Sequence, residues 1–444
     1  MGGLSVGAGK AEIRYTPEML PTFGENYTAI HDLPMVQVLL LESRGRFAVI
    51  SVDAVILEIQ DQLLSVAEEE LGLGRENILL QATHVLATPH FRQWSNVEEW
   101  MSDPGHRRDP VSEAEATRFM TGENRMVQTH VEAVRSACRQ AAATLQKASF
   151  GVGLARANVT VNRVVETKNG WWQGVNQDGP TDQTVPVLRF DGENGKTIAL
   201  LYNVNVAPGC MEFSEVNGGR MVSGDLAGAS QRFIDRVFGD DVVSIYTTGA
   251  TGDQWQALRA RLDYLDREGN QIVVDLGEQG FALVEVLAAR LGEKVVQAAD
   301  RIRTGPVKNP LTLERFVFTY PGQRVETGAG WNDPTKDCQF VEEGLQPAKI
   351  AILAIENTAI VACGVELCVE SLKAIKEASP FAHTFLMEFA AEGGGYMPTE
   401  IFYDRASFQA RKCRYAKGGA EQFAKDVIQS LNEVYQKHMV VEKE

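Results

Sequence analysis

Short apolar runs alternate with longer amphipathic segments along the first part of the chain. The runs are rich in Val, Ile and Leu and are bounded by turn-forming residues, which is typical of buried strands. The longer segments repeat their apolar residues at helical spacing. The pattern predicts strands over 36–42, 47–53, 77–83, 149–154, 185–190, 197–206 and 242–248. It predicts helices over 56–73, 124–147 and 276–299.

The rest of the chain is richer in strand patterns. It predicts strands over 311–320, 350–355 and 358–364, and helices over 367–378 and 419–438. Strands that alternate with helices indicate a layered α/β fold. We expect a single domain over 1–444, with a subdivision near 300–310 as the alternative. The polar stretch 84–122 lacks clear periodicity and is predicted to be a functional loop, because structureless connections of that length are uncommon.

Four polar residues fall at or near the ends of predicted strands. They are Asp53, His84, Asp253 and Glu366. In α/β folds the ends of the strands form the edge at which ligands bind. The pattern therefore predicts a polar site at this edge. Alternatively, Asp53 caps the end of its strand and Asp253 belongs to a turn.

Composition narrows the classes of partner. The net charge is −16, with a sequence pI near 5.1, so the average field of the protein repels a nucleic-acid backbone. The chain shows no secretory signal and no apolar run long enough for a membrane span. We expect a soluble, cytoplasmic protein that binds a small-molecule substrate, with neither nucleic acid nor membrane as partner, and with a homo-oligomer as an open alternative. The six cysteines are scattered without a CxxC pair, so we expect free thiols.

A series of short motifs follows in a fixed order: VGAGKAEIRYTPE, IHDLPMVQVLLLE, AVISVDAV, NILLQATH, VSGDLAG, GATGD, CGVELCVESLKAIKEAS and GYMPTE. Together they resemble the neutral/alkaline ceramidase family over about residues 5–435. The resemblance is to the N-terminal catalytic domain, as in a divergent, short relative of bacterial type. It implies a layered mixed α/β catalytic domain without the C-terminal immunoglobulin-like domain of ceramidases. It also implies a hydrolase in which zinc activates a water for attack on an amide carbonyl.

The resemblance assigns roles to four residues of this chain. His84, Glu366 and Tyr396 stand where the family has a histidine, a glutamate and a tyrosine that bind zinc. Arg163, in an Asn-Arg motif, stands where an arginine faces the pocket. We therefore expect His84, Glu366 and Tyr396 to hold zinc or another divalent metal, and Arg163 and Tyr396 to act on the substrate.

Three positions depart from the family pattern. Leu86 and Ala207 replace two histidines, and Phe408 replaces a tyrosine. One imidazole, one carboxylate and one phenolate make a poor zinc site, because Zn²⁺ favours nitrogen and sulfur ligands. A further residue could complete the site. The candidates are His90, which lies in the same loop as His84, and His31, Cys210 and Asp225.

Three functions are consistent with this site. The leading hypothesis is a hydrolase of an amide or related bond in a small polar substrate, not ceramide, that uses a divergent metal site. The second is a metal-independent enzyme in which His84 or His90 forms an acid–base pair with Glu366 and cleaves a glycoside, or acts as a lyase or epimerase on a sugar acid. The third is a protein that binds a ligand without catalysis.

Overall fold

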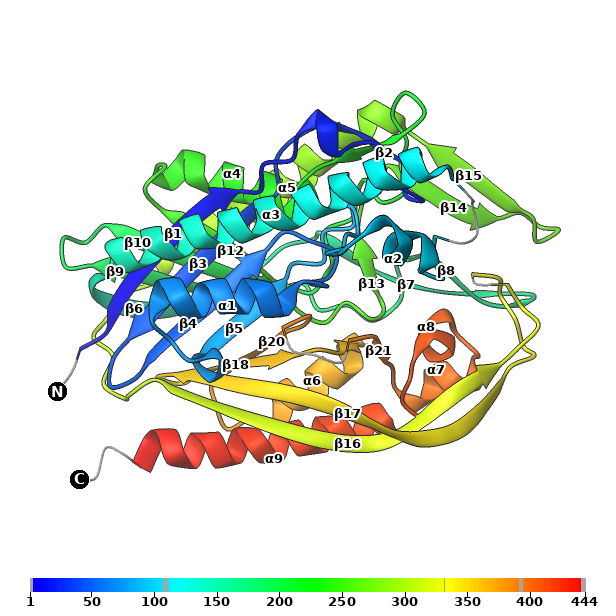
Figure 1. The fold of residues 1–444 in the computed structure, drawn as a ribbon. Coiled ribbons are helices and arrows are strands. Elements are labelled where there is room, and N and C mark those ends of the chain that lie inside the picture. Colours follow the sequence, from blue (N-terminus) through cyan, green and yellow to red (C-terminus); the bar gives the residue numbers. More distant parts are fainter. Residues whose placement is uncertain (1–2, 107–110, 331, 391–393, 441–444) are drawn as a thin grey trace.

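The computed structural model describes residues 3–106, 111–330, 332–390 and 394–440. Two sheets pack face to face, and helices cover the outer face of each sheet, so the layers run helix, sheet, sheet, helix (Figure 1). The predicted layered α/β class is confirmed.

The larger sheet has eight strands. In spatial order they are β12 (Val243–Thr248), β10 (Thr197–Val204), β9 (Thr184–Gly192), β6 (Gln146–Arg156), β1 (Ser5–Glu12), β3 (Met35–Glu42), β4 (Arg46–Val52) and β5 (Ile78–Ala82). The pairs β10–β12 and β4–β5 are parallel, whereas the other neighbours are antiparallel. The sheet is therefore mixed.

Strands such as β3, β4 and β10 are largely apolar because both faces of the sheet are buried there. In β3, Val38 and Leu40 pack against helices α1 (Gln60–Leu71) and α3 (Glu113–Ala143), whereas Leu39 and Leu41 pack against the second sheet. Helices α4 (Asp225–Phe238) and α5 (Gly280–Arg301) cover the β9–β10–β12 side in the same way. The alternating side chains of one strand thus build two separate cores.

The second sheet has four strands in the order β16 (Thr312–Glu326), β17 (Gln339–Ile355), β18 (Thr358–Cys363) and β20 (His383–Met387). The outer face of this sheet packs on α6 (Val369–Ala378) and α9 (Gly419–Val440). The inner face contributes Ala351, Leu353 and Ile360 to the core that it shares with the larger sheet.

Short elements surround one edge of the two sheets, where the strands end. They are β2 (Tyr27–Ile30) with β11 (Arg220–Val222), β7 (Thr160–Thr167) with β8 (Gly170–Asn176) and β13 (Gln254–Gln256), β14 (Arg261–Leu265) with β15 (Gln271–Asp275), and β19 (Glu366–Leu367) with β21 (Tyr396–Met397). The short helices are α2 (Val97–Ser102), α7 (Glu400–Asp404) and α8 (Phe408–Lys412). Most of the predicted site residues lie on these elements.

The predicted loop over 84–122 is only partly a loop. It contains α2, and α3 starts at Glu113 rather than at the predicted position 124. Ser112 and Glu115 form a capping box that begins α3, and the first turns of the helix carry only a short apolar face, which packs on Trp100. Polar side chains on those turns hid the helical periodicity from the sequence prediction. Within the described ranges, no helix is both long enough and apolar enough to cross a membrane.

Gly7 on β1 allows α3 to lie directly on the sheet. A Cβ atom added at Gly7 would lie 1.9 Å from the backbone oxygen of Ala141 on α3. We predict that Gly7→Ala lowers the free energy of unfolding by about 1–3 kcal/mol, because the helix must move away from β1.

Urea denaturation measures this change, with Gly3→Ala as the matched control. A Cβ atom at Gly3 has no atom within 4 Å, so that variant should unfold as the wild type does. Equal midpoints for both variants would contradict the close approach of α3 to β1.

Candidate functional site

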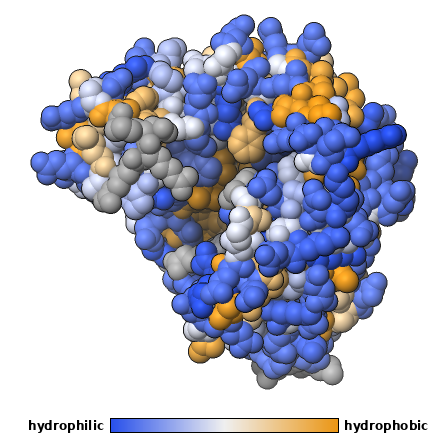
Figure 2. Space-filling view, turned by 90° about the vertical axis from the view of Figure 1, so that its right-hand side faces the viewer, coloured by the Kyte–Doolittle hydropathy of each residue, from blue (hydrophilic) through white to orange (hydrophobic). Residues whose placement is uncertain are grey.

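A cavity of about 500 Å³ lies where strand ends from both sheets meet. The face that carries the short elements is hollowed (Figure 2). The cavity is lined by residues from many parts of the chain: His84, Leu86, Arg163, Gln173, Ala207, Glu212, Phe213, Thr251, Gln254, Trp255, Arg259, Arg261, Asp263, Gln271, Asn332, Glu366, Gly395, Tyr396, Phe408 and Lys412. The four residues to which the resemblance assigned roles are among them.

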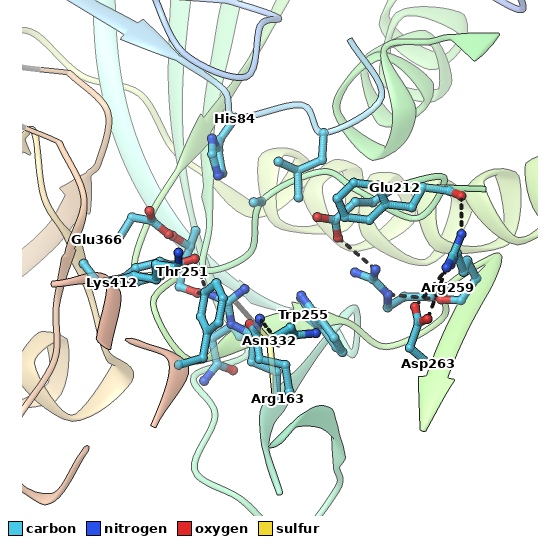
Figure 3. Close-up of a pocket in the computed structure, with 18 of the residues that line it drawn as sticks. His84, Arg163, Glu212, Thr251, Trp255, Arg259, Asp263, Asn332, Glu366 and Lys412 are labelled. Atoms are coloured by element: carbon cyan, nitrogen blue, oxygen red, sulfur yellow. Dashed lines mark hydrogen bonds and ion pairs between the residues drawn. The ribbon is translucent and has the colours of Figure 1, made fainter. Parts of the chain in front are cut away.

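His84 lies two residues past the end of β5 and has a positive φ of 59°, which is uncommon for a residue other than glycine. The imidazole Nδ1 lies 2.6 Å from the backbone oxygen of Val55, and the ring stacks on Phe389 at 4.0 Å. Since a carbonyl only accepts, Nδ1 carries the proton and Nε2 keeps a lone pair. Burial lowers the pKa of His84 to about 4, so the ring is neutral at physiological pH. Figure 3 shows the ring directed into the cavity on the side of Glu366.

Glu366 lies just after β18 on the two-residue strand β19, which pairs in parallel with β21. Its backbone N–H donates to the oxygen of Gly395 at 3.0 Å, and the residue is only 7% exposed. Burial raises the pKa of Glu366 to about 7, although the charge of Arg163 and the hydroxyls of Thr251 and Tyr396 oppose the rise. This carboxyl can therefore gain or lose a proton near neutral pH.

Arg163 on β7 bridges the backbone of Gly252 and the side chain of Tyr396. Its Nη2 donates to the Tyr396 hydroxyl at 3.0 Å and to the Gly252 oxygen at 2.8 Å. Burial raises the pKa of Tyr396, so the phenol stays protonated. Because the Tyr396 oxygen accepts from Arg163, its own proton is available for another acceptor.

Sequence reasoning missed a second buried carboxyl group, Glu388, which directly follows β20. Its Oε2 accepts from the hydroxyl of Thr251 at 2.9 Å, and its Oε1 accepts from the backbone N–H of Leu367 at 2.7 Å. The Thr251 hydroxyl also lies 3.4 Å from Glu366 Oε2. Burial, with the charge of Glu366, raises the pKa of Glu388 well above its ordinary value. The sequence signal that could have identified Glu388 is the one that identified Glu366: an acidic residue that follows an apolar strand.

The other strand-end candidates hold loops together. Asp253 accepts hydrogen bonds from Val369 N at 3.0 Å and from Asn162 Nδ2 at 3.1 Å. Asp53 accepts from Met35 N at 2.9 Å and does not line the cavity. Of the four strand-end residues that were expected to form one polar site, only His84 and Glu366 line the cavity.

His90 is not brought into the cavity. Its backbone N–H and its Nδ1 both pair with the carboxylate of Glu25, at 2.7 and 2.8 Å. Neither His90 nor Glu25 is among the residues that line the cavity, so this geometry gives no support to the predicted catalytic role of His90, which stays a prediction. The sequence placed His90 near His84 along the chain, but the loop turns its side chain toward Glu25.

The residues at the predicted metal site do not make up a zinc site. Leu86 and Ala207 line the cavity, and neither can bind a metal. In the part of the chain that the structure describes, no three His, Cys, Asp or Glu side chains are grouped to hold a metal ion. Arg163 already donates to Tyr396, and its positive charge opposes a second cation there. The donor set of His84, Glu366 and Tyr396 therefore does not fit the zinc that the resemblance implies.

A second wall of the cavity, also missed by sequence reasoning, carries ion pairs. Arg259 Nη2 lies 2.8 Å from Glu212 Oε2, and the Arg259 Cζ lies 4.0 Å from the centre of the Trp255 ring. Arg261 pairs with Asp263 at 3.3 Å. Figure 3 shows this wall across the cavity from Glu366.

The sequence matches no family model and no curated protein. A solved structure described as a ceramidase complexed with C2 has a TM-score of 0.70 at 14% identity and covers 98% of this chain and 76% of its own. The neutral ceramidase from Pseudomonas aeruginosa has a TM-score of 0.66 at 14% identity and covers 98% of this chain and 75% of its own. The resemblance inferred from the short motifs is confirmed at the level of the fold, and this chain has the fold of neutral ceramidases.

Proposed function

We propose that this chain is a hydrolase that cleaves an amide or related bond in a small, polar substrate, with Glu366 as the general base. The observation that carries the proposal is the buried Glu366 carboxyl, whose pKa of about 7 lies near the operating pH of a base. It lies in the cavity with the lone pair of a neutral His84.

In the proposed reaction, a water binds between His84 Nε2 and the Glu366 carboxylate. Nε2 accepts one water hydrogen and orients the molecule, and Glu366 removes the other proton as the water oxygen attacks the carbonyl carbon. The protonated Glu366 then donates that proton to the leaving nitrogen as the C–N bond breaks. The carboxylate is regenerated, so the proton balance closes in one cycle.

Tyr396 and Arg163 would stabilise the negative charge that develops on the carbonyl oxygen. The Tyr396 hydroxyl accepts from Arg163 and donates to the ionised Glu366 carboxylate, so its proton would turn to the oxyanion once Glu366 has taken the proton of the water. The guanidinium adds a fixed positive charge in a buried site, where charge interactions are stronger than in water.

The fold supports hydrolysis as the reaction class. The two solved structures compared above are named ceramidases, and a ceramidase is an amide hydrolase. The cavity wall argues for a different substrate, because four cationic and three acidic side chains line it. Such a wall favours a small polar molecule over a long acyl chain.

An acid–base enzyme acting on a sugar or sugar acid is the second candidate. Trp255 lines the cavity together with the side-chain amides of Gln173, Gln254 and Asn332. An aromatic face with nearby amides suits a sugar ring and its hydroxyls. Release of a reducing sugar in place of an amine distinguishes this candidate from the first.

The proposal predicts the pH dependence of the reaction. For a panel of N-acyl amino acids, kcat/KM should rise with pH up to about 7 and then level off, because only ionised Glu366 can accept the proton. Glu366→Gln should lower kcat by about 10²–10⁴-fold. The measurement is amine release across the pH range.

A rate that falls as pH rises through 7 would contradict the role of Glu366 as the base. His90→Gln is the matched control and should keep the wild-type profile, since His90 lies outside the cavity.

Glu366→Gln should also change stability. The folded-state pKa of about 7 exceeds the ordinary 4.5, so the folded state holds this proton more tightly and the wild type loses stability as pH rises from 4.5 to 7. At about pH 8 the variant should be more stable by about 1–3 kcal/mol, and near pH 4.5 the difference should vanish. Denaturant unfolding at both pH values measures this. An equal difference at both values would show that Glu366 does not titrate with a raised pKa.

Metal content is a separate prediction. Protein purified without chelator should carry less than about 0.1 zinc per chain, and EDTA should not change its activity. Ala207→His combined with Leu86→His restores two imidazoles and should raise the zinc content toward about one per chain by elemental analysis. Stoichiometric zinc in the wild type, lost together with activity on chelation, would overturn the metal-free mechanism.

A further inference from the structure

Arg259 is a buried cation whose bonding is incomplete. It follows β13 on the cavity wall and is 6% exposed. One part of its guanidinium faces Glu212 and one face covers Trp255. Its Nη1 is buried and has no hydrogen-bond partner among the described residues. A buried donor without a partner destabilises the folded state, so a ligand atom that accepts from it gains affinity.

A second polar atom on the cavity wall is also unpartnered. Gln173 Oε1 is buried without a hydrogen bond, although its Nε2 donates to Asn332 Oδ1 at 3.3 Å. Both Gln173 and Arg259 line the cavity. A polar ligand in the cavity could give both atoms the hydrogen-bond partners that they lack.

The charge of the cavity differs from that of the whole protein. The cationic side chains are Arg163, Arg259, Arg261 and Lys412, and the acidic side chains are Glu212, Asp263 and Glu366. The chain as a whole carries a net charge of −16. A positively charged cavity in an acidic protein concentrates small anions there and disfavours cations.

Trp255 separates two guanidinium groups. The Arg163 Cζ lies 6.0 Å from the Trp255 ring centre, and the Arg259 Cζ lies 4.0 Å from it. Arg163 belongs to the end of the cavity that holds Tyr396, and Arg259 to the opposite wall (Figure 3). A substrate across Trp255 could place its scissile bond at one end and an anionic group at the other.

We propose that the substrate carries a carboxylate, which Arg259 binds beside Trp255. The inference rests on the proposed function, because it takes the cavity to be the substrate site. The guanidinium fork matches a carboxylate. Glu212, 2.8 Å from Arg259 Nη2, repels a doubly charged phosphate more than a singly charged carboxylate. The substrate class is therefore a small acid with an amide bond, such as an N-acyl amino acid.

Calorimetric titration of Glu366→Gln tests binding without turnover. The probes are N-acetylglycine, its neutral counterpart N-acetylglycinamide, and inorganic phosphate. We expect N-acetylglycine to bind at least about tenfold more tightly than the other two. Equal binding of the acid and the amide, or tighter binding of phosphate, would overturn the proposal.

Substitutions of two arginines on the cavity wall test whether Arg259 is the residue that binds the carboxylate. In the same Glu366→Gln background, Arg259→Gln should weaken N-acetylglycine binding by about tenfold or more. Arg261→Gln is the matched control. It removes the same charge from the same wall, but Arg261 Nη1 already donates to the Phe213 oxygen and its Nε and Nη2 donate to Asp263, so binding should change by less than about threefold. Equal losses in both variants would show a general charge effect and overturn the assignment to Arg259.

A folding defect is controlled separately. Arg259→Gln leaves Glu212 unpaired, so the double variant Arg259→Gln with Glu212→Gln removes both charges and should fold while still failing to bind N-acetylglycine. Normal binding by this double variant would overturn the proposal.

Turnover by the wild type separates the proposed carboxylate site from the proposed hydrolase function. If N-acetylglycine binds through Arg259 but no amide in the panel is hydrolysed, the proposed function fails and the carboxylate site stands. If N-acyl amino acids and their neutral amide counterparts are hydrolysed equally well, the carboxylate site fails and the hydrolase stands.

Discussion

The chemistry of the cavity depends on one buried contact, in which the hydroxyl of Thr251 lies between the carboxyl groups of Glu366 and Glu388. The three residues follow three different strands, β12, β18 and β20, so the contact forms only when the two sheets are packed. Backbone N–H groups of Leu367 and Thr251 hold Glu388 in place. Burial raises the pKa of Glu366 to about 7, and burial together with the charge of Glu366 raises the pKa of Glu388, so the two carboxyl groups do not both ionise easily.

The same fold supports a site unlike that of a zinc enzyme. The sheets and helices match those of neutral ceramidases over nearly the whole chain, yet Leu86 and Ala207 give the cavity apolar surface where the resemblance implies histidines. Polar groups instead gather on the wall that carries Arg259 and Glu212. A fold fixes where strand ends converge, and the side chains at those ends decide the chemistry.

Much of the fold could be predicted from the sequence, because strands buried on both faces read as continuous apolar runs, as β3 does. The start of α3 was missed because the apolar face of its first turns is short, limited to Ala116, Phe119 and Met120 among polar residues. His84 and Glu366 could be found because each follows an apolar strand. Glu388 gives the same local signal, but only the packing of the sheets shows which strand-end acids meet. The pairing of Arg259 with Trp255 and Glu212 leaves no periodicity in the sequence.

The protonation of Glu366 is the most direct test of the account. Carbon NMR of protein labelled at the glutamate side-chain carboxyl can follow each glutamate through a pH titration, and Glu366→Gln identifies the signal. The account predicts a carboxyl that titrates near pH 7 and whose midpoint is the same with and without chelator. A Glu366 carboxylate that stays ionised down to about pH 4, or that titrates near 7 only after zinc is removed, would contradict it.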